Sequence, residues 1–148
     1  MGWLVDVVTN PFLMTSIGAW FIAQVIKTIL HFIIYRKLDF KRMYGDGGMP
    51  SGHSATVASL AMMCGLSFGF RSVQFALGMV FAIVVCHDAA GVRRETGKQA
   101  VVLNELLESL STGKDVNLKE WVGHTPFQVF VGVLIGIGVA LFTHFVIM

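Results

Sequence analysis

Charged residues are scarce in this chain. Only 14% of its 148 residues are Asp, Glu, Lys or Arg, against about 25% in soluble domains. Hydrophobic residues make up 55%, which is more apolar surface than a soluble fold of this length can bury. The formal net charge is only +2, and no run of basic residues exceeds two. We therefore expect a membrane protein with no nucleic-acid partner.

Cysteines and metal-binding motifs are equally sparse. Cys64 and Cys86 both lie inside apolar stretches, which favours helix packing over a disulfide or a metal site. The sequence contains no His-Glu-x-x-His or Cys-x-x-Cys motif, so we expect no metal and no other cofactor. Residues 1–10 lack the basic region and the cleavage site of a signal peptide, so the first apolar helix is expected to be retained.

Long apolar runs are what the chain has in abundance. A helix that spans a bilayer needs about 20 residues, and the runs predict spanning helices over residues 12–35, 54–70, 73–90 and 126–147. Apolar residues also recur near helical spacing before the last run, which predicts an amphipathic surface helix over residues 98–110. We therefore expect an all-α fold, a single membrane domain over residues 1–148 with a bundle of about four transmembrane helices.

Basic residues gather in two connections, and this predicts the orientation of the chain. Only Arg71 lies between the second and third apolar runs. By the positive-inside rule the two basic connections face the cytoplasm and both termini lie outside. We expect this orientation in a bacterial plasma membrane. The basic residues of the two connections are Arg36, Lys37, Lys41, Arg42, Arg93, Arg94, Lys98, Lys114 and Lys119.

The predicted topology brings three polar segments to one membrane surface, namely residues 50–53, 88–94 and 123–126. Lys27, in the first span, shares a helix face with Gln24 and His31. An ionisable residue inside a span is a functional candidate. The alternative is that Lys27 extends its amine to the interface or makes a structural ion pair.

Two histidine segments are candidates for an anion site. Ser51, Gly52 and His53 open the second span, where backbone N–H groups and the helix dipole favour a negative group. The alternative is that the serine only caps a helix. His124 precedes the last span, with Gln128 one turn later, within reach of its ring. The alternative there is a turn with a capped helix.

Charged side chains near the end of the third span complete the set of candidates. Arg93 and Arg94 carry the planar fork that binds phosphate oxygens in pairs, although lipid headgroups would also attract them. Asp88 is placed to balance this charge or to orient a histidine. The sequence therefore predicts a phosphate site at the cytoplasmic surface.

These segments resemble the divergent branch of the type 2 phosphatidic acid phosphatase superfamily, which is related to the vanadium-dependent haloperoxidases. The resemblance covers nearly the whole chain. The matching segments are Ala23-Gln24-Val25-Ile26-Lys27, Gly47-Gly48-Met49-Pro50-Ser51-Gly52-His53-Ser54-Ala55, Asp88-Ala89-Ala90-Gly91-Val92-Arg93-Arg94, residues 97–104, Gly123-His124-Thr125-Pro126, Gln128-Val129 and Gly132.

The resemblance implies a role for each matching residue. In the wider superfamily, a Pro-Ser-Gly-His histidine protonates the leaving oxygen and a later histidine attacks phosphorus to form a phosphohistidine. These roles fall on His53 and His124. Lys27, Arg93 and Arg94 are the nearest matches to the lysine and arginines that hold the phosphoryl oxygens, and this chemistry needs no metal.

Three positions depart from the superfamily pattern. Where the first motif expects Arg-Pro, this chain has Ile34, and Arg36 follows two residues later as the nearest arginine available for phosphate binding. Leu118 stands where an arginine is expected before His124. Gln128 replaces an aspartate, and an amide orients an imidazole without stabilising its positive form as a carboxylate does.

The hypothesis from sequence is a phosphatase that hydrolyses a phosphorylated membrane lipid, either a phosphate ester or a diphosphate. The alternatives are a membrane protein that binds, transports or assembles lipid phosphates without turnover, and a purely structural bundle. Gly132 and Gly136 form a Gly-x-x-x-Gly pair in the last span, with Gly138 close by. Because such pairs let helices approach closely, we also expect a homodimer through the glycine-bearing helices.

Overall fold

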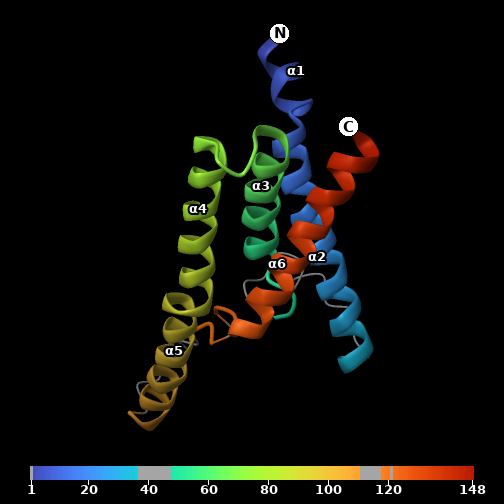
Figure 1. Ribbon diagram of the computed structural model, residues 1–148. Coiled ribbons are helices and arrows are strands. Elements are labelled where there is room, and N and C mark those ends of the chain that lie inside the picture. The colour runs from blue at the N-terminus through green and yellow to red at the C-terminus, as the bar shows by residue number, and fades with distance from the viewer. Residues whose placement is uncertain (1, 37–47, 111–117, 121) are drawn as a thin grey trace.

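Helices make up every regular element in the described part of the chain. The computed structural model describes residues 2–36, 48–110, 118–120 and 122–148, and no strand occurs among them. This confirms the all-α fold. The elements, shown in Figure 1, are α1 (Gly2–Val8), α2 (Pro11–Tyr35), α3 (Gly52–Phe68), α4 (Val73–Ala90), α5 (Val92–Ser109), α6 (Pro126–Phe142) and a last π-helical turn, η2 (Thr143–Ile147). Lys37, Lys41, Arg42, Gly47 and Lys114, used above, lie outside the described residues.

Polar caps decide where the bundle helices begin. The side chains of Asn10, Ser51, Ser72 and Thr125 each accept a hydrogen bond from a backbone N–H in the first turn of the helix that follows. Pro11 and Pro126 occupy the first helical position, where a missing N–H costs no intrahelical bond. Each apolar run therefore begins its helix at a cap that is visible in the sequence.

Helix α3 lies at the centre of the bundle and packs against α2, α4 and α6 (Figure 1). Most of its buried residues are small, which lets the neighbouring helices approach closely. A Cβ atom at Gly132 of α6 would lie 2.4 Å from the Ser51 carbonyl oxygen, and one at Gly136 would lie 2.3 Å from that of Ala55. The Gly-x-x-x-Gly pair is therefore buried against α3 within the chain, and a homodimer stays a prediction.

The expected number of four spans is confirmed only in part. Among the residues that the structure describes, three segments are long and apolar enough to cross a membrane, namely Pro11–Tyr35, Val73–Ser109 and Pro126–Ile147. Helix α3 has 17 residues, which is at the short limit for a span. Because three other helices surround it, α3 need not face lipid along its length. The structure supports a membrane bundle but does not confirm the fourth span.

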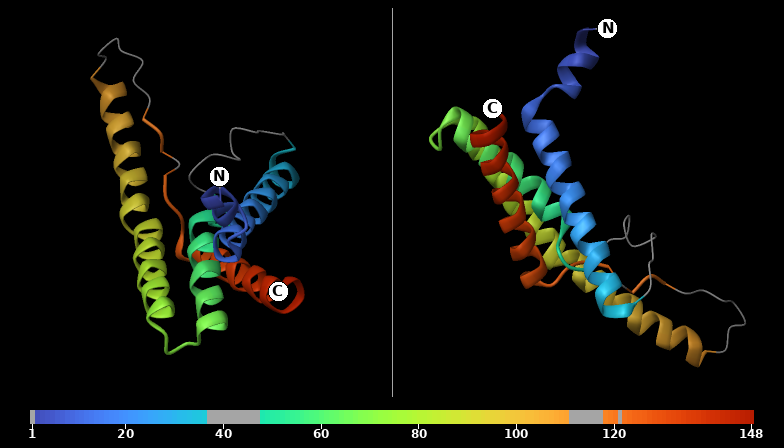
Figure 2. Two further views of the ribbon diagram at one scale, coloured as in Figure 1. Left: turned by 90° about the horizontal axis from the view of Figure 1, so that it is seen from above. Right: turned by 90° about the vertical axis from the view of Figure 1, so that its right-hand side faces the viewer.

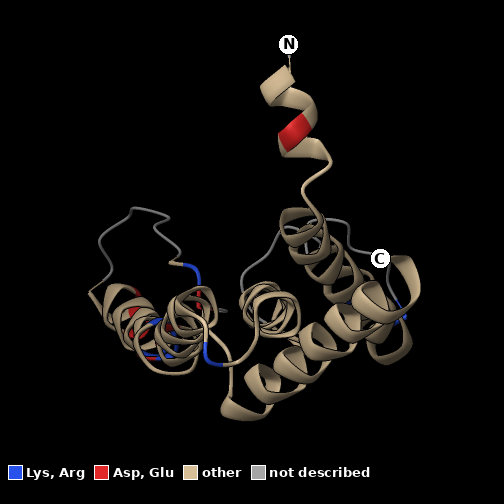
Figure 3. Cartoon of the chain, turned by 45° about the horizontal axis from the view of Figure 1, so that its top comes forward, with Lys and Arg blue, Asp and Glu red and all other residues tan. Residues whose placement is uncertain are grey.

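Helix α5 corrects the predicted surface helix. We expected it over residues 98–110, but it begins at Val92 and ends at Ser109. Only Gly91 separates it from α4, and Figures 1 and 2 show the two helices as one long rod that extends beyond the bundle. Much of the charge lies on α5, whereas the bundle helices are almost uncharged (Figure 3). The pair Arg93 and Arg94 therefore lies in the first turn of a helix.

The two ends of the bundle differ in character. Both termini and the turn between α3 and α4 lie at one end (Figure 1). The start of α3, the end of α4 and the start of α6 lie together at the other end. This second end holds the polar segments that the sequence predicted to meet.

Candidate functional site

Backbone hydrogen bonds join the three polar segments. The N–H of Ser51, at the start of α3, donates to the carbonyl oxygen of Gln128 in the first turn of α6, at 3.1 Å. The N–H of His124 donates to the carbonyl oxygen of Ala89, near the end of α4, at 2.9 Å. These bonds fix the two histidine segments against each other.

Gly123 permits the approach of the His124 segment to α5. Its φ of +84° favours glycine, and a Cβ atom there would lie 2.3 Å from the backbone nitrogen of Arg94. Gly97 makes a second such contact, because its Cβ atom would lie 2.7 Å from the carbonyl oxygens of Glu120 and Val122. The segment before α6 is thus held directly on the α5 backbone.

His53 and His124 face each other at this junction. Their ring centroids are 6.4 Å apart and their planes are inclined at 58°. His124 is buried, with 3% of its surface exposed, whereas His53 is partly exposed. The structure therefore brings together the two histidines that lie 71 positions apart in the sequence.

The surroundings of His124 keep its imidazole neutral. Burial lowers the pKa of His124 to about 4, and the nearby positive charges of Lys27 and His53 act in the same direction. The side chain of Gln128 and the carbonyl of Gly48 oppose this shift but are outweighed. Nδ1 of His124 is buried and has no hydrogen bond of ordinary length and angle within the described residues. A neutral imidazole is the form that can act as a nucleophile.

Lys27 reaches the site from α2 with a buried side chain. Only 5% of its surface is exposed, so it does not extend to the membrane surface. A Cβ atom at Gly48 would lie 3.8 Å from Cγ and Cδ of Lys27, which places the side chain beside the segment that leads into α3. Its positive charge is one of the causes that lower the pKa of His124.

Ser51 and Gly52 serve the packing of α3 at the same place. The Ser51 hydroxyl caps the helix, because it accepts from the Ser54 N–H at 3.3 Å and from the Ser54 hydroxyl at 2.9 Å. A Cβ atom at Gly52 would lie 3.2 Å from Cδ1 of Trp20 and 3.7 Å from Cδ of Gln24. Ser51 therefore caps α3, its role in anion binding stays a prediction, and Gly52 admits α2 close to the helix N-terminus.

A cleft of about 420 Å³ opens beside His124. Within the part of the chain that the structure describes, no group of three or more His, Cys, Asp or Glu residues is placed to hold a metal ion. Of the arginines expected to bind phosphate, Arg94 lines the cleft. The lining residues are Gly48, Arg94, Val101, Glu120, Val122, Gly123, His124, Thr125 and Gln128.

The other predicted charged residues lie differently. Arg93 donates from Nε to Oδ2 of Asp88 at 2.7 Å, with 40% of each side chain exposed. Asp88 therefore balances the charge of an arginine, which is one of the two roles that the sequence suggested for it. Arg36 is exposed at the C-cap of α2, about 13 Å along the helix from Lys27, and does not line the cleft.

Gln128 closes a capping box at the start of α6. Its Oε1 accepts from the Thr125 N–H at 3.0 Å, and its own N–H donates to the Thr125 hydroxyl at 3.3 Å. Its amide oxygen therefore already accepts a hydrogen bond from the backbone at the start of α6. Sequence reasoning did not single out Glu120, which has no motif, although it lines the cleft and accepts from the Asn104 amide at 2.8 Å.

Comparison with known proteins places the chain among membrane proteins. A family described as "Divergent PAP2 family" matches residues 8–139. The uncharacterized membrane protein YuiD of Bacillus subtilis (strain 168) is 40% identical over 146 residues, which cover 89% of this chain and 92% of the relative. No solved structure matches.

Proposed function

The chain belongs to the Divergent PAP2 family, and from this membership we propose that it is a membrane phosphatase that removes a terminal phosphate from a lipid phosphate or diphosphate. The observation that carries the proposal is the pairing of His53 and His124, with ring centroids 6.4 Å apart. The two rings are therefore neighbours at one site, as a nucleophile and an acid that act on the same phosphoryl group must be.

The first step forms a phosphohistidine on His124. A ring nitrogen of His124 attacks phosphorus with its lone pair, and the bond from phosphorus to the lipid oxygen breaks. His53 donates its proton to that oxygen, so the lipid leaves as an alcohol, or as a monophosphate when the substrate is a diphosphate.

The second step regenerates the enzyme. His53, now neutral, takes a proton from water as the water oxygen attacks phosphorus. The bond between His124 and phosphorus then breaks, and inorganic phosphate is released. Each histidine ends in its starting state, and no metal ion takes part in either step.

The positive groups around the pair support this assignment. The buried charge of Lys27 lies near His124, and the first N–H groups of α3 are at the same end of the bundle. Fixed positive groups in a site of low polarity stabilise the charge that develops on phosphoryl oxygens. Arg94, which lines the cleft, is placed to attract the anionic substrate.

Location at the end of a membrane bundle supports a lipid substrate. The histidines lie where α3 and α6 begin, and helices of this length end near the headgroup region of a bilayer. A lipid phosphate can therefore enter the cleft while its hydrocarbon chains remain among the helices.

A second candidate is a protein that binds lipid phosphates without hydrolysing them. The observation that favours it is the state of Gln128, whose amide oxygen accepts from Thr125. No carboxylate is then present at this position to stabilise a positive imidazole, and Nδ1 of His124 has no hydrogen bond of ordinary geometry among the described residues. Such a site would retain the anion but react slowly.

Phosphate release from purified protein separates the two candidates. Full-length protein in vesicles would be assayed with phosphatidic acid and with a polyprenyl diphosphate. We expect release by the wild type and by His144→Ala, whose histidine lies at the opposite end of α6, in η2. We expect loss of release in His53→Ala and His124→Ala. Release that survives both substitutions contradicts the phosphatase, and saturable binding of phosphatidic acid without release in the wild type supports the binder.

A further inference from the structure

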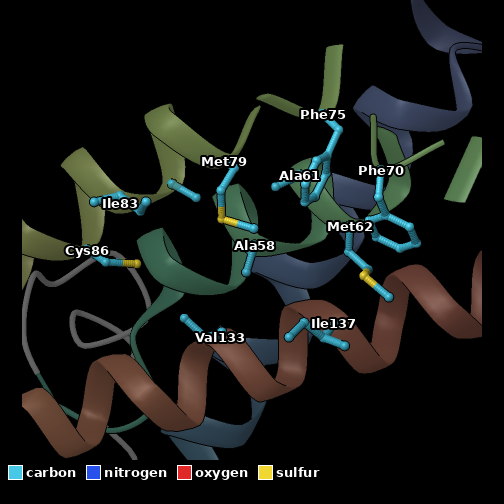
Figure 4. A pocket seen from close by; sticks show the side chains of 11 residues that line it. Ala58, Ala61, Met62, Phe70, Phe75, Met79, Ile83, Cys86, Val133 and Ile137 are labelled. Atoms are coloured by element: carbon cyan, nitrogen blue, oxygen red, sulfur yellow. The ribbon is translucent and has the colours of Figure 1, made fainter. Parts of the chain in front are cut away.

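A second cavity lies between α3, α4 and α6, and it is open on the side where Phe70, Met79 and Ile83 are exposed. Its volume is about 360 Å³, within the range of pockets that hold small ligands. Every side chain that lines it is apolar or a cysteine (Figure 4). Neither the histidine chemistry nor the family membership assigns it a role.

Small residues line this apolar pocket where α4 and α6 pack closely against α3. Ala58 and Ala61 of α3 and Ala82 of α4 contribute only methyl groups to its wall. Where α3 and α4 cross, a Cβ atom at Gly78 would lie 3.1 Å from Cα of Ala61. Helices α4 and α6 make few contacts with each other, so the space between them over α3 stays open.

The pocket begins near the histidine pair. Cys86, at one end of its α4 lining, lies one helical turn before Ala89, whose carbonyl oxygen accepts from the His124 N–H. Ala58 lies five residues after His53 on α3, which is about 7–8 Å along the helix. Both helices thus bring this end of the pocket within one to two turns of the site.

Two aromatic rings line the other end. Phe70 and Phe75 stack edge to face with centroids 5.1 Å apart. Gly65 makes room for them, because a Cβ atom there would lie 2.5 Å from Phe70 and 2.9 Å from Phe75. From Cys86 to Phe75 the pocket follows α4 for about 16 Å. This is close to half of the bilayer hydrocarbon core, which is about 30 Å thick.

We infer that this apolar pocket holds one hydrocarbon chain of the lipid whose phosphate group binds between His53 and His124. This inference rests on the proposed function for the identity of the headgroup. The nearness of the histidine pair at one end, the aromatic rings at the other and a length close to one bilayer leaflet all fit an extended lipid chain. A helix of a second copy, about 10–12 Å in diameter, is too wide for a cavity of about 360 Å³ that extends about 16 Å along α4.

Photolabelling tests the occupant without requiring turnover. The probe is a phosphatidic acid with a diazirine near the end of one palmitoyl chain, irradiated with the full-length protein in vesicles. We expect labelled peptides to contain Phe70, Phe75 or Met62, and unlabelled phosphatidic acid to compete. Labelling spread over outward residues such as Val80 and Leu134, without competition, overturns the inference.

Substitutions that fill the pocket provide a second test. Met79→Trp and Val133→Trp place a large ring in the pocket, whereas Val80→Trp and Leu134→Trp place it on neighbouring exposed positions that do not line the pocket. We expect labelling of each pocket variant by the palmitoyl probe to fall at least about tenfold. The kcat/KM of each pocket variant for the palmitoyl lipid should fall at least about tenfold more than its kcat/KM for dihexanoyl phosphatidic acid. The exposed variants should match the wild type. Equal behaviour of all four variants contradicts a chain-binding pocket.

The outcomes separate this inference from the proposed function. Competed pocket labelling with no phosphate release means that the pocket binds a lipid chain but the protein is not a phosphatase. Phosphate release that depends on His124, together with pocket variants that behave as wild type, means that the protein is a phosphatase but the pocket does not bind the lipid chain. Efficient crosslinking of two chains through Cys86 by a short bismaleimide would show a second copy at the pocket and overturn the inference.

Discussion

His124 combines burial with nearby positive charge, and this sets its protonation. Its pKa is lowered to about 4, whereas an exposed histidine titrates near 6.5. The ring is therefore neutral throughout the physiological range. The imidazole that must attack phosphorus is then ready to react without first losing a proton.

This lowered pKa predicts how stability depends on pH. Between pH 6.5 and about 4 the unfolded chain protonates His124 and the folded chain does not, so the stability contribution is fully present above 6.5 and is lost as the pH falls. Relative to His124→Gln, we expect the wild type to lose on the order of 2 kcal/mol more between pH 7.5 and 5. Thermal unfolding in detergent at the two pH values measures this. Equal losses in both proteins contradict the assigned pKa.

Gln128→Glu is the single substitution that tests the environment of His124 most directly. Gln128→Glu keeps an oxygen for the Thr125 N–H and adds a negative charge beside His124. We expect the pKa of His124 to rise by about one unit or more and phosphate release to increase several-fold, because the carboxylate stabilises the positive imidazole. NMR titration of labelled histidine and the vesicle assay measure the two effects. Unchanged values for both would show that position 128 does not act on His124.

The candidate residues were predictable from the sequence only where a motif marks them. His53 and His124 belong to short segments with helix-cap and glycine signals, and the structure brings them together. The sequence left two roles open for Asp88 and did not predict the backbone partner of Gln128. These partners depend on which donor lies nearest after folding, and here Arg93 donates to Asp88 and the Thr125 N–H donates to Gln128.

The contact between α3 and α6 depends on two glycines. A Cβ atom at Gly136 would lie 2.3 Å from the Ala55 carbonyl oxygen and 2.9 Å from the Ser59 nitrogen, whereas one at Gly138 meets nothing within 4 Å. We expect Gly136→Ala to destabilise the fold by about 1–3 kcal/mol. Gly138→Ala should be neutral or slightly stabilising, because alanine favours helix. Thermal unfolding in detergent compares them, and equal effects would contradict the packing described.

Element boundaries show where sequence reasoning failed. The caps and apolar runs predicted the starts of α2, α4 and α6 to within one residue. The start of α5 was missed because Gly91, Arg93 and Arg94 look like the end of a span and the beginning of a loop. In the structure the helix continues past Gly91, since Gly97 and Ala100 are buried and Asn104 binds both backbone groups of Leu118.

The orientation of the bundle is a prediction from the distribution of basic residues. Arg71 lies in the turn between α3 and α4, at the opposite end from Lys98 of α5, and both are exposed. In a background without Cys64 and Cys86, we expect Arg71→Cys to react with an impermeant maleimide added to intact cells. Lys98→Cys should react only after permeabilisation. The reverse pattern would place the histidine site outside the cell.

The number of membrane spans cannot be predicted from the hydropathy of each apolar run alone. Residues 54–70 predicted a fourth span, and the helix that forms there, α3, has 17 residues and packs against three others. Whether a short helix faces lipid or protein depends on tertiary packing, which hydropathy does not describe. The bundle could therefore be predicted, and the arrangement around α3 could not.

Trapping of a phosphohistidine tests the proposed reaction most directly. Full-length protein in vesicles would be mixed with phosphatidic acid carrying ³²P in its phosphate, quenched within the first turnover at alkaline pH, and digested for mass spectrometry. The proposed mechanism predicts a phosphorylated His124 that is absent from His124→Ala and unaffected by His144→Ala. Release of phosphate with no labelled His124 at any time point would contradict it.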